Sequence, residues 1–339
     1  MTKMKKILAV GLASVLAVSF AACSKPSDDN SGTDSKDAAA AKTGLAVISE
    51  IKEDEYNKSE TALEIDSVAA AVLVDADGKI IDVKIDEAQT KPDLTVNDGN
   101  VDDLRTKLEK KEDYGMKDVS AANGIGKEWY EQAAAFEAWA KGKTADEVKA
   151  GVGADGYAAD ADLKAGCTIV AVGFSEVVAK AVAAAEDCGA SSTDTLKLSV
   201  ATEKYYESNE TNLQYDSNYA AVTLDADGKV TSCLIDASQA KCTIADGKFT
   251  VEKGAFITKK ELGDDYAMKA VSASMGNIAD GGEWYEQAAA FETWVKGKTA
   301  ADIKAGVGED GKPSDADLKA GCTIVVSSIA ENVAKAATV

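Results

Sequence analysis

The segment Asp162-Leu-Lys-Ala-Gly166-Cys167-Thr168 places a carboxylate, a thiol and a hydroxyl around a glycine. A hydroxyl that forms a phosphoester must be reachable, and a small neighbour leaves space for a bulky phosphate. Gly166 provides that space, and its backbone N–H is a donor for a phosphate oxygen. The residue types therefore allow a phosphate to approach Thr168. The same residues recur later in the chain as Asp317, Gly321, Cys322 and Thr323.

Histidine is absent from the chain, and Arg105 is its only arginine. Catalysis at neutral pH relies on histidine more than on any other side chain. Catalytic triads that need histidine and zinc sites with histidine ligands are therefore excluded. A reductase that clamps carboxylate substrates with several arginines is disfavoured too. Any redox chemistry would have to be carried by a cofactor.

The chain contains one long pattern twice. Residues 128–137 (EWYEQAAAFE) recur unchanged at 283–292, and the segment around Thr168 recurs as well. A period of about 150 residues predicts duplicated domains rather than a solenoid of short units. We therefore expect repeat 1 at 44–187 and repeat 2 at 195–339.

Each repeat is predicted to be α+β, a small antiparallel sheet plus helices. Apolar, β-branched runs at 68–74 and 80–85 flank Asp-Ala-Asp-Gly, which predicts a hairpin. Apolar residues at helical spacing begin at Trp129, and Gly142 provides a stop. Thr144 begins a capping-box pattern that opens a second helix.

The end of each repeat is predicted to contain a strand followed by a helix. Residues 167–172 are mostly apolar and predict a short strand. Ser175 is a suitable N-cap for a helix over 176–185. Thr168 would then lie at the start of a strand.

This succession of motif, apolar strand and Ala/Val-rich helix resembles the FMN-binding domain family. That family includes flavin subunits of membrane oxidoreductases and flavinylated extracellular lipoproteins of Gram-positive bacteria. The resemblance spans each repeat, about 68–185 in the first, although only the seven-residue motif is specific. In this family a secreted flavin transferase esterifies a threonine hydroxyl with the phosphate of FMN. The resemblance implies that FMN is joined to Thr168 and Thr323, with Asp162 and Asp317 at the motif's aspartate and Gly166 and Gly321 at its small residue.

The motif departs from the family pattern at two positions in each copy. Ala165 stands where the family has Ser or Thr, which removes a hydroxyl that could position the phosphate. Cys167 stands where the family has Ala, which puts a thiol beside the acceptor. A purely structural interpretation also fits, with Thr168 and Cys167 half-buried and Gly166 at a turn. The second copy has the same departures, Ala320 and Cys322.

Aromatic residues of the repeated helix are candidates for contact with a flavin ring. Trp129 and Tyr130 are adjacent, so one of them should face away from the core and is the better candidate. Phe136 and Phe291 are expected in the core, because an aromatic stripe at helical spacing usually packs inward.

The N-terminus has the pattern of a lipoprotein signal peptide over residues 1–22. Three lysines precede an apolar run at 7–20, and Ala-Ala-Cys23 follows. The cysteine resembles the lipobox residue that bacteria diacylate, so we expect lipidation at Cys23. Residues 23–43 hold no large apolar side chain and are expected to form a disordered tether. An ordinary signal peptide and a released peptide signal near 15–22 are the alternatives.

The chain is strongly acidic, with a formal net charge of −21. Loss of the signal removes three lysines and no acid, which leaves −24. Such a charge excludes nucleic-acid binding, which needs lysine and arginine for the phosphates. It also disfavours anionic lipid headgroups, so membrane attachment should rest on the lipid anchor alone.

The remaining cysteines and two partial motifs indicate no metal or phosphate site. Cys233 and Cys242 could pair across a hairpin or remain free buried thiols. Gly142-Lys-Thr lacks the first glycine of a P-loop, since Glu137 occupies that position. Asp75-Ala-Asp-Gly resembles half a calcium loop, but a turn fits better.

Two functions are open at this point. The first is an electron-transfer protein on the outer face of the cytoplasmic membrane, with covalent FMN on each repeat. It would relay electrons from a membrane NADH dehydrogenase or the quinone pool to extracellular acceptors. The second is a surface lipoprotein without flavin that binds a small ligand, a peptide or a protein. A self-contained enzyme is not expected, because two copies of a small domain use up the chain.

Overall fold

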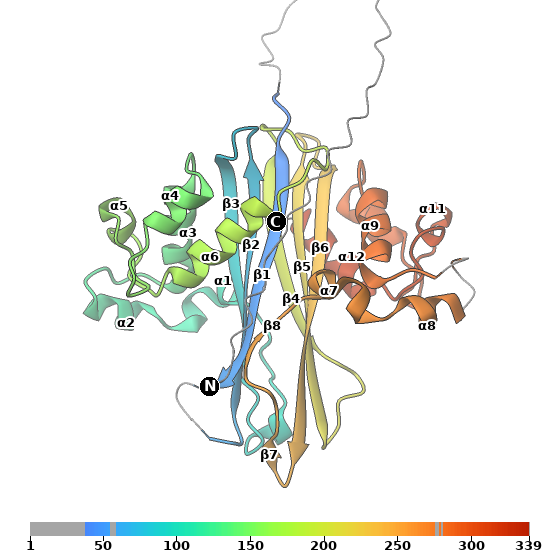
Figure 1. Ribbon diagram of the computed structural model, residues 1–339, viewed down its shortest axis with the longest axis horizontal. Helices are drawn as coiled ribbons and strands as arrows, with labels where there is room; N and C mark the ends of the chain where they lie inside the picture. Colours follow the sequence, from blue (N-terminus) through green and yellow to red (C-terminus); the bar gives the residue numbers. More distant parts are fainter. Residues whose placement is uncertain (1–37, 55–58, 275–277, 279–280, 339) are drawn as a thin grey trace, which may run out of the picture. The chain divides into compact units, whose positions relative to one another are not determined.

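Two four-stranded antiparallel sheets and several helices make up the α+β fold of the computed structural model (Figure 1). The structure describes residues 38–54, 59–274, 278 and 281–338. The expected signal peptide, Cys23 and the expected tether as far as residue 37 lie outside the described residues. From Ala38 onward the chain forms a single compact unit.

The strands fall into two sheets. The first sheet has the order β3-β2-β1-β8, with β1 (Lys42–Glu53), β2 (Leu63–Val74), β3 (Ile80–Thr90) and β8 (Gly254–Phe256). The second has the order β4-β5-β6-β7, with β4 (Thr195–Lys204), β5 (Asn212–Leu224), β6 (Val230–Ala245) and β7 (Lys248–Phe249).

The helices follow the strands in the same order in both halves. Those before β4 are α1 (Lys107–Lys110), α2 (Lys117–Ala122), α3 (Trp129–Ala140), α4 (Ala145–Ala150), α5 (Ala161–Lys164) and α6 (Val172–Ala183). Those after β8 are α7 (Lys259–Leu262), α8 (Lys269–Ser274), α9 (Trp284–Trp294), α10 (Ala300–Ala305), α11 (Ala316–Lys319) and α12 (Ser327–Ala336). Within the described residues, no helix is both long and apolar enough to cross a bilayer.

The predicted hairpin and the predicted helix start at Thr144 are confirmed. Asp75 Oδ1 accepts the N–H groups of Asp77 and Lys79 at 2.9 and 2.8 Å, and Gly78 adopts a φ of 76°. This closes the turn between β2 and β3. The Thr144 capping box begins α4, with its reciprocal bonds to Glu147.

The two sheets pack face to face. Leu73 and Ala71 of the first sheet share a buried cluster with Leu196 and Leu234 of the second. Hydroxyls also meet across this interface, where Thr43 and Ser232 lie 2.6 Å apart. Small apolar and hydroxyl side chains let two sheets approach closely, as in a β-sandwich.

The second half of the chain completes the first sheet. Strand β8 pairs antiparallel with β1, with Phe256 opposite Ser49 and Gly254 opposite Ile51. An edge strand of the first sheet thus comes from the second half of the chain. This pairing ties the two halves into one unit.

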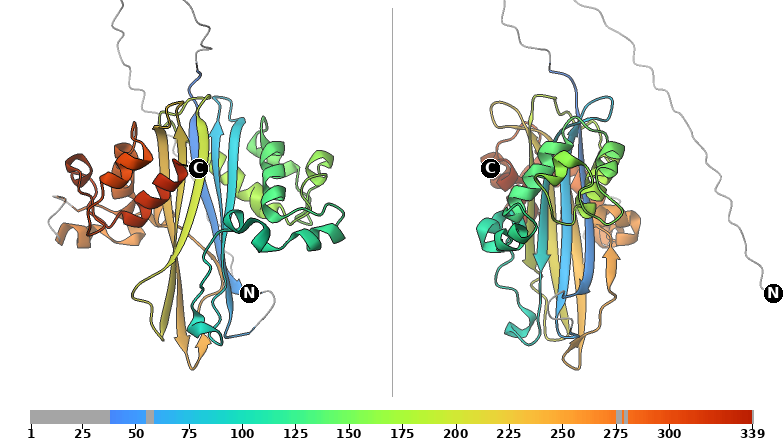
Figure 2. Two further views of the ribbon diagram at one scale, coloured as in Figure 1. Left: turned by 180° about the vertical axis from the view of Figure 1, so that it is seen from behind. Right: turned by 90° about the vertical axis from the view of Figure 1, so that its left-hand side faces the viewer.

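The helices cover the outer faces of the stacked sheets. Helices α3 and α6 pack against β1, β2 and β3, whereas α9 and α12 pack against β4, β5 and β6. The side view of Figure 2 shows helices on both outer faces. Gly44 lets α6 approach β1, because a Cβ at this position would lie 2.1 Å from the Ala181 carbonyl oxygen.

The expected tether reaches too far into the folded unit. Strand β1 begins at Lys42, and Ala41 and Thr43 are buried. The Ala41 N–H donates to the Ala190 carbonyl at 3.0 Å, so residues before Lys42 are also held. The boundary at residue 43 is therefore wrong by several residues.

A disulfide between Cys233 and Cys242 is ruled out by the strand that carries them. Both lie on β6, nine residues apart, which corresponds to about 30 Å of strand. Disulfides need Cα atoms within about 7 Å. Both are free buried thiols, the other expected alternative.

Buried carboxyl groups give the fold an unusual expected pH dependence. Glu137, which spoils the P-loop pattern, accepts the Ile85 N–H at 2.8 Å. Burial raises the pKa of its carboxyl to about 7 from 4.5. Burial likewise raises the pKa of Asp66 to about 7 and that of Asp86 to about 6.

A folded state with raised carboxyl pKa values holds protons that the unfolded chain has already released. Stability should therefore fall as pH rises from about 4.5 to 7. Glu137→Gln keeps an acceptor for the Ile85 N–H. It should reduce the loss of unfolding free energy between pH 4.5 and 7 by about 3 kcal/mol. Urea unfolding at pH 5 and 7.5 measures both effects. A stability that rises with pH over this range would contradict the prediction.

Candidate functional site

The two candidate threonines are held by glutamines of the neighbouring helix. Gln287 Oε1 accepts the Thr323 N–H at 2.9 Å and its hydroxyl at 3.2 Å. Gln132 binds Thr168 in the same way, at 2.9 and 3.3 Å. Both threonines are half-buried, and each hydroxyl is bonded to the side chain of a buried glutamine.

The glycine of each motif packs directly against that helix. A Cβ on Gly166 would lie 2.7 Å from the Ala135 Cβ, and one on Gly321 would lie 2.7 Å from the Ala290 Cβ. Real carbon atoms do not approach so closely, so a side chain here would push the motif off its helix. Glycine is thus needed for packing, whatever space it also leaves for a phosphate.

The expected strand over 167–172 is wrong. This segment is an irregular loop that leads into α6, which begins at Val172. The Gly156 carbonyl accepts the N–H groups of Ala171 and Val172 at 2.8 and 3.1 Å, so the backbone pairs with a loop and no neighbouring strand. A short apolar run in the sequence does not distinguish a strand from such an irregular segment.

The expected N-cap is wrong for a related reason. Ser175 lies inside the first turn of α6, and its hydroxyl donates to the Val172 carbonyl at 2.9 Å. Ala171 occupies the cap position instead.

The motif aspartates are exposed and do not cap the helices that carry them. Asp162 and Asp317 are exposed on the short helices α5 and α11. The capping role belongs to the preceding acids: Asp160 Oδ1 accepts the N–H groups of Asp162 and Leu163 at 2.9 and 3.1 Å. Asp315 caps α11 in the same way.

The motif cysteines belong to the hydrophobic core. Cys167 and Cys322 are both 0% exposed and pack in the clusters under α3 and α9. Burial raises the pKa of Cys167 to about 11 and that of Cys322 to about 12. Both are therefore neutral thiols at physiological pH, with little nucleophilic character.

Thr323 lines a cavity of about 410 Å³. Lys312 and Lys319 lie on its wall together with Asp310 and Pro313. Ligand pockets commonly measure 300–1,000 Å³, so the space suits a medium-sized molecule. Two lysines and one aspartate on the wall leave a net positive charge that suits a phosphate.

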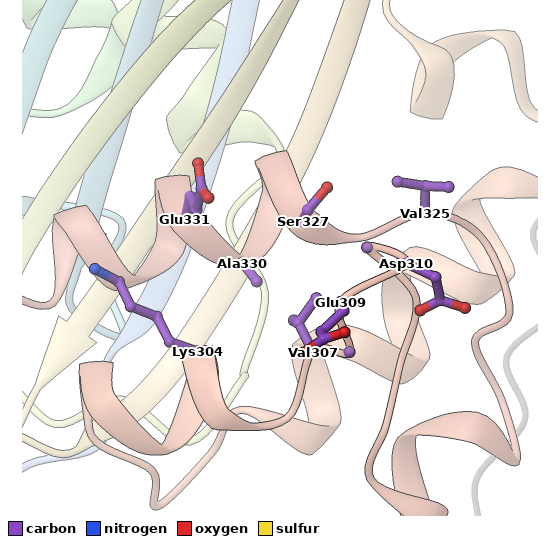
Figure 3. A pocket seen from close by; sticks show the side chains of 10 residues that line it. Lys304, Val307, Glu309, Asp310, Val325, Ser327, Ala330 and Glu331 are labelled. Carbon is purple, nitrogen blue, oxygen red and sulfur yellow. The ribbon is translucent and has the colours of Figure 1, made fainter.

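A larger cavity of about 720 Å³ adjoins this one and shares Gly308 and Asp310 with it (Figure 3). Val307, Val325 and Ala330 give it an apolar side. Val325 follows Thr323 by two residues and is 57% exposed. The larger cavity is also lined by Lys304, Glu309 and Glu331, so it combines apolar side chains with mainly acidic ones.

The helix aromatics divide as expected between the core and the surface. Trp129 and Phe136 are buried, whereas the Tyr130 hydroxyl donates to Glu112 at 3.0 Å near the surface. In the second half, Phe291 is buried, and Tyr285 lines a different cavity from that of Thr323. Tyr285, the outward-facing tyrosine of this helix, therefore does not line the cavity of Thr323.

Sequence reasoning missed the glutamines and the lysines of the site. A glutamine on the apolar face of a helix was the available signal, because a buried amide needs a specific partner. Lys312 has no counterpart in the first half, where Tyr157 stands. Among the described residues, no group of three or more metal-binding side chains gathers.

Gln287→Leu should lower the free energy of unfolding by about 1–3 kcal/mol, because it leaves buried polar groups without partners. The amide also donates to the Gly282 carbonyl at 3.0 Å, so two backbone groups lose a bond. Gln132→Leu is the matched variant in the first half and should act similarly. Denaturant unfolding measures both, and a cost below about 0.5 kcal/mol for each would show that these bonds position nothing.

Comparison of the chain with protein-family models, with curated proteins and with solved structures found no match in any of the three.

Proposed function

We propose that this chain is a lipid-anchored extracellular electron-transfer protein that carries FMN as a phosphoester on Thr323 and Thr168. The two halves are proposed to be tandem copies of one FMN-binding-like unit, and Cys23 is the proposed lipid attachment site. The observation that carries the proposal is that the half-buried residue Thr323 lines a cavity of about 410 Å³ together with Lys312 and Lys319.

The attachment step needs only a positioned hydroxyl from this chain. The Thr323 oxygen forms a bond to phosphorus, its proton is released, and the leaving group departs from a phosphoanhydride of FMN supplied by a flavin transferase. Gln287 Oε1 accepts a hydrogen bond from the Thr323 hydroxyl and so holds the hydroxyl oxygen in one orientation. Lys312 and Lys319 offset the phosphate charge. Once bound, FMN supplies the reversible redox chemistry that the side chains lack.

The electron route follows from the placement of the two threonines. The motif helices α5 and α11 lie on opposite sides of the stacked sheets (Figure 1). Each flavin would therefore exchange electrons independently of the other. It would accept them from a membrane NADH dehydrogenase or a quinone-linked donor and pass them to an extracellular acceptor.

Export together with a flavin transferase tests the proposal. The protein band should fluoresce under ultraviolet light after denaturing electrophoresis, because a covalent flavin stays with the chain. A colourless, dark band from cells with an active transferase would instead favour the ligand-binding surface lipoprotein. The tight contact of Gly321 with Ala290 is the observation that supports this second function, since it explains the glycine without a phosphate.

A further inference from the structure

Lys259, at the start of α7, is a half-buried lysine without a carboxylate partner. Its ammonium lies 5.2 Å from the centre of the Tyr266 ring and 5.5 Å from that of Trp284. No carboxylate oxygen in the described part of the chain lies within 4.0 Å of it. Burial lowers the pKa of this amine below its ordinary value.

The first half of the chain shows the same lysine with its partner. Lys107 lies 5.1 Å from the Tyr114 ring and 5.8 Å from the Trp129 ring, and its Nζ is 2.7 Å from Glu87 Oε1. The two lysines thus share one aromatic setting and differ in the ion pair.

The register explains the difference. Asp86 accepts the Leu108 N–H at 3.2 Å, and Asp236 accepts the Lys260 N–H at 3.1 Å, so these two acids occupy equivalent places. The next residue is Glu87 in the first half and Ala237 in the second. The second half therefore has the lysine and its rings but lacks the carboxylate.

A cavity of about 370 Å³ is present beside Lys259. Lys241, Gln239 and Tyr266 also line it, and Phe256, Ile257 and Leu262 provide apolar surface. Asp265 is the one acid on its wall among the described residues.

The other nearby acids are already engaged. Asp216 accepts hydrogen bonds from the amides of Gln214 and Gln239 at 2.7 and 3.2 Å, and Asp236 accepts two backbone N–H groups. Lys259 and Lys241 therefore offer two ammonium groups beside an apolar wall, although Asp216 and Asp236 keep their charges and partly offset that of Lys259.

We propose that this cavity binds a small organic carboxylate with an apolar tail, whose carboxylate pairs with Lys259 as Glu87 pairs with Lys107 in the first half. The carboxylate pairs with Lys259 and Lys241, and the tail lies against Phe256, Ile257 and Leu262. The proposal is independent of flavin attachment, because Thr323 lines a different cavity.

The test titrates benzoate and hexanoate into the purified full chain without flavin and follows tryptophan fluorescence, since Trp284 borders Lys259. One equivalent should bind. Ala237→Glu, which restores the internal carboxylate, and Lys259→Met should each weaken binding at least tenfold.

Circular dichroism establishes that each variant is folded, and Lys259→Met provides a second route if Ala237→Glu does not fold. Unchanged binding by a folded Ala237→Glu or Lys259→Met would overturn the proposal. So would the absence of any saturable signal in the wild-type chain, or equally tight binding of inorganic phosphate, which lacks the apolar tail.

Discussion

Replacing both Thr168 and Thr323 by valine should yield a folded, exported protein with no covalent flavin, whereas each single variant should retain one. Valine has the shape of threonine without its oxygen, so no phosphoester can form. The backbone N–H of each residue would still donate to its glutamine, at 2.9 Å in the parent structure. The loss of one weak hydroxyl bond should cost only about 1 kcal/mol of stability.

The matched control for this prediction is serine. Thr323→Ser and Thr168→Ser keep a hydroxyl at the same position and should still be labelled. Flavin absorbance per chain, measured after denaturation and gel filtration, gives the stoichiometry. A double valine variant that still carries bound flavin would place the acceptor elsewhere in the chain.

Removing one partner of the Lys107–Glu87 ion pair should be the most destabilising single change outside the apolar core. The two side chains are 9% and 10% exposed and lie 2.7 Å apart. Glu87→Ala or Lys107→Met leaves the other charge buried and unpaired, which typically costs about 3–5 kcal/mol. Lys259→Met removes an already unpaired lysine in the second half and should cost far less.

The same pair predicts a loss of stability at high pH. Burial alone would lower the pKa of Lys107, but Glu87 and other nearby charges raise it above the ordinary 10.5. The contribution of the pair is therefore complete below pH 10.5 and is lost as the pH rises further.

Denaturant unfolding of the parent and the three variants at pH 8 measures the costs of the substitutions. Equal costs for Lys107→Met and Lys259→Met would contradict the role assigned to Glu87.

The hairpin and the main helices were predictable because their signals are local. Asp75 and Gly78 determine a turn within five residues, and Thr144 and Glu147 determine a helix start within four. The core positions of Trp129 and Phe136 follow from helical spacing. Such features depend little on what the rest of the chain does.

The errors concern features that depend on distant residues. Residues 167–172 are as apolar as a strand. However, the Gly156 carbonyl and the Gln132 side chain accept hydrogen bonds from their backbone N–H groups, so this segment does not pair with a strand. The pairing of β8 with β1 joins segments about 200 residues apart and leaves no local signal. Lys319 belongs to the motif itself, whereas Lys312, on the loop after Gly308, shares the cavity wall with Thr323 only in the folded chain.

The mass of the intact protein, isolated from membranes of cells that contain a flavin transferase, tests the central claim most directly. The account predicts that the chain gains the mass of two FMN groups, each less one water, and that peptide fragmentation locates them at Thr168 and Thr323. A chain without this gain, from cells in which another substrate of the transferase is labelled, would contradict it.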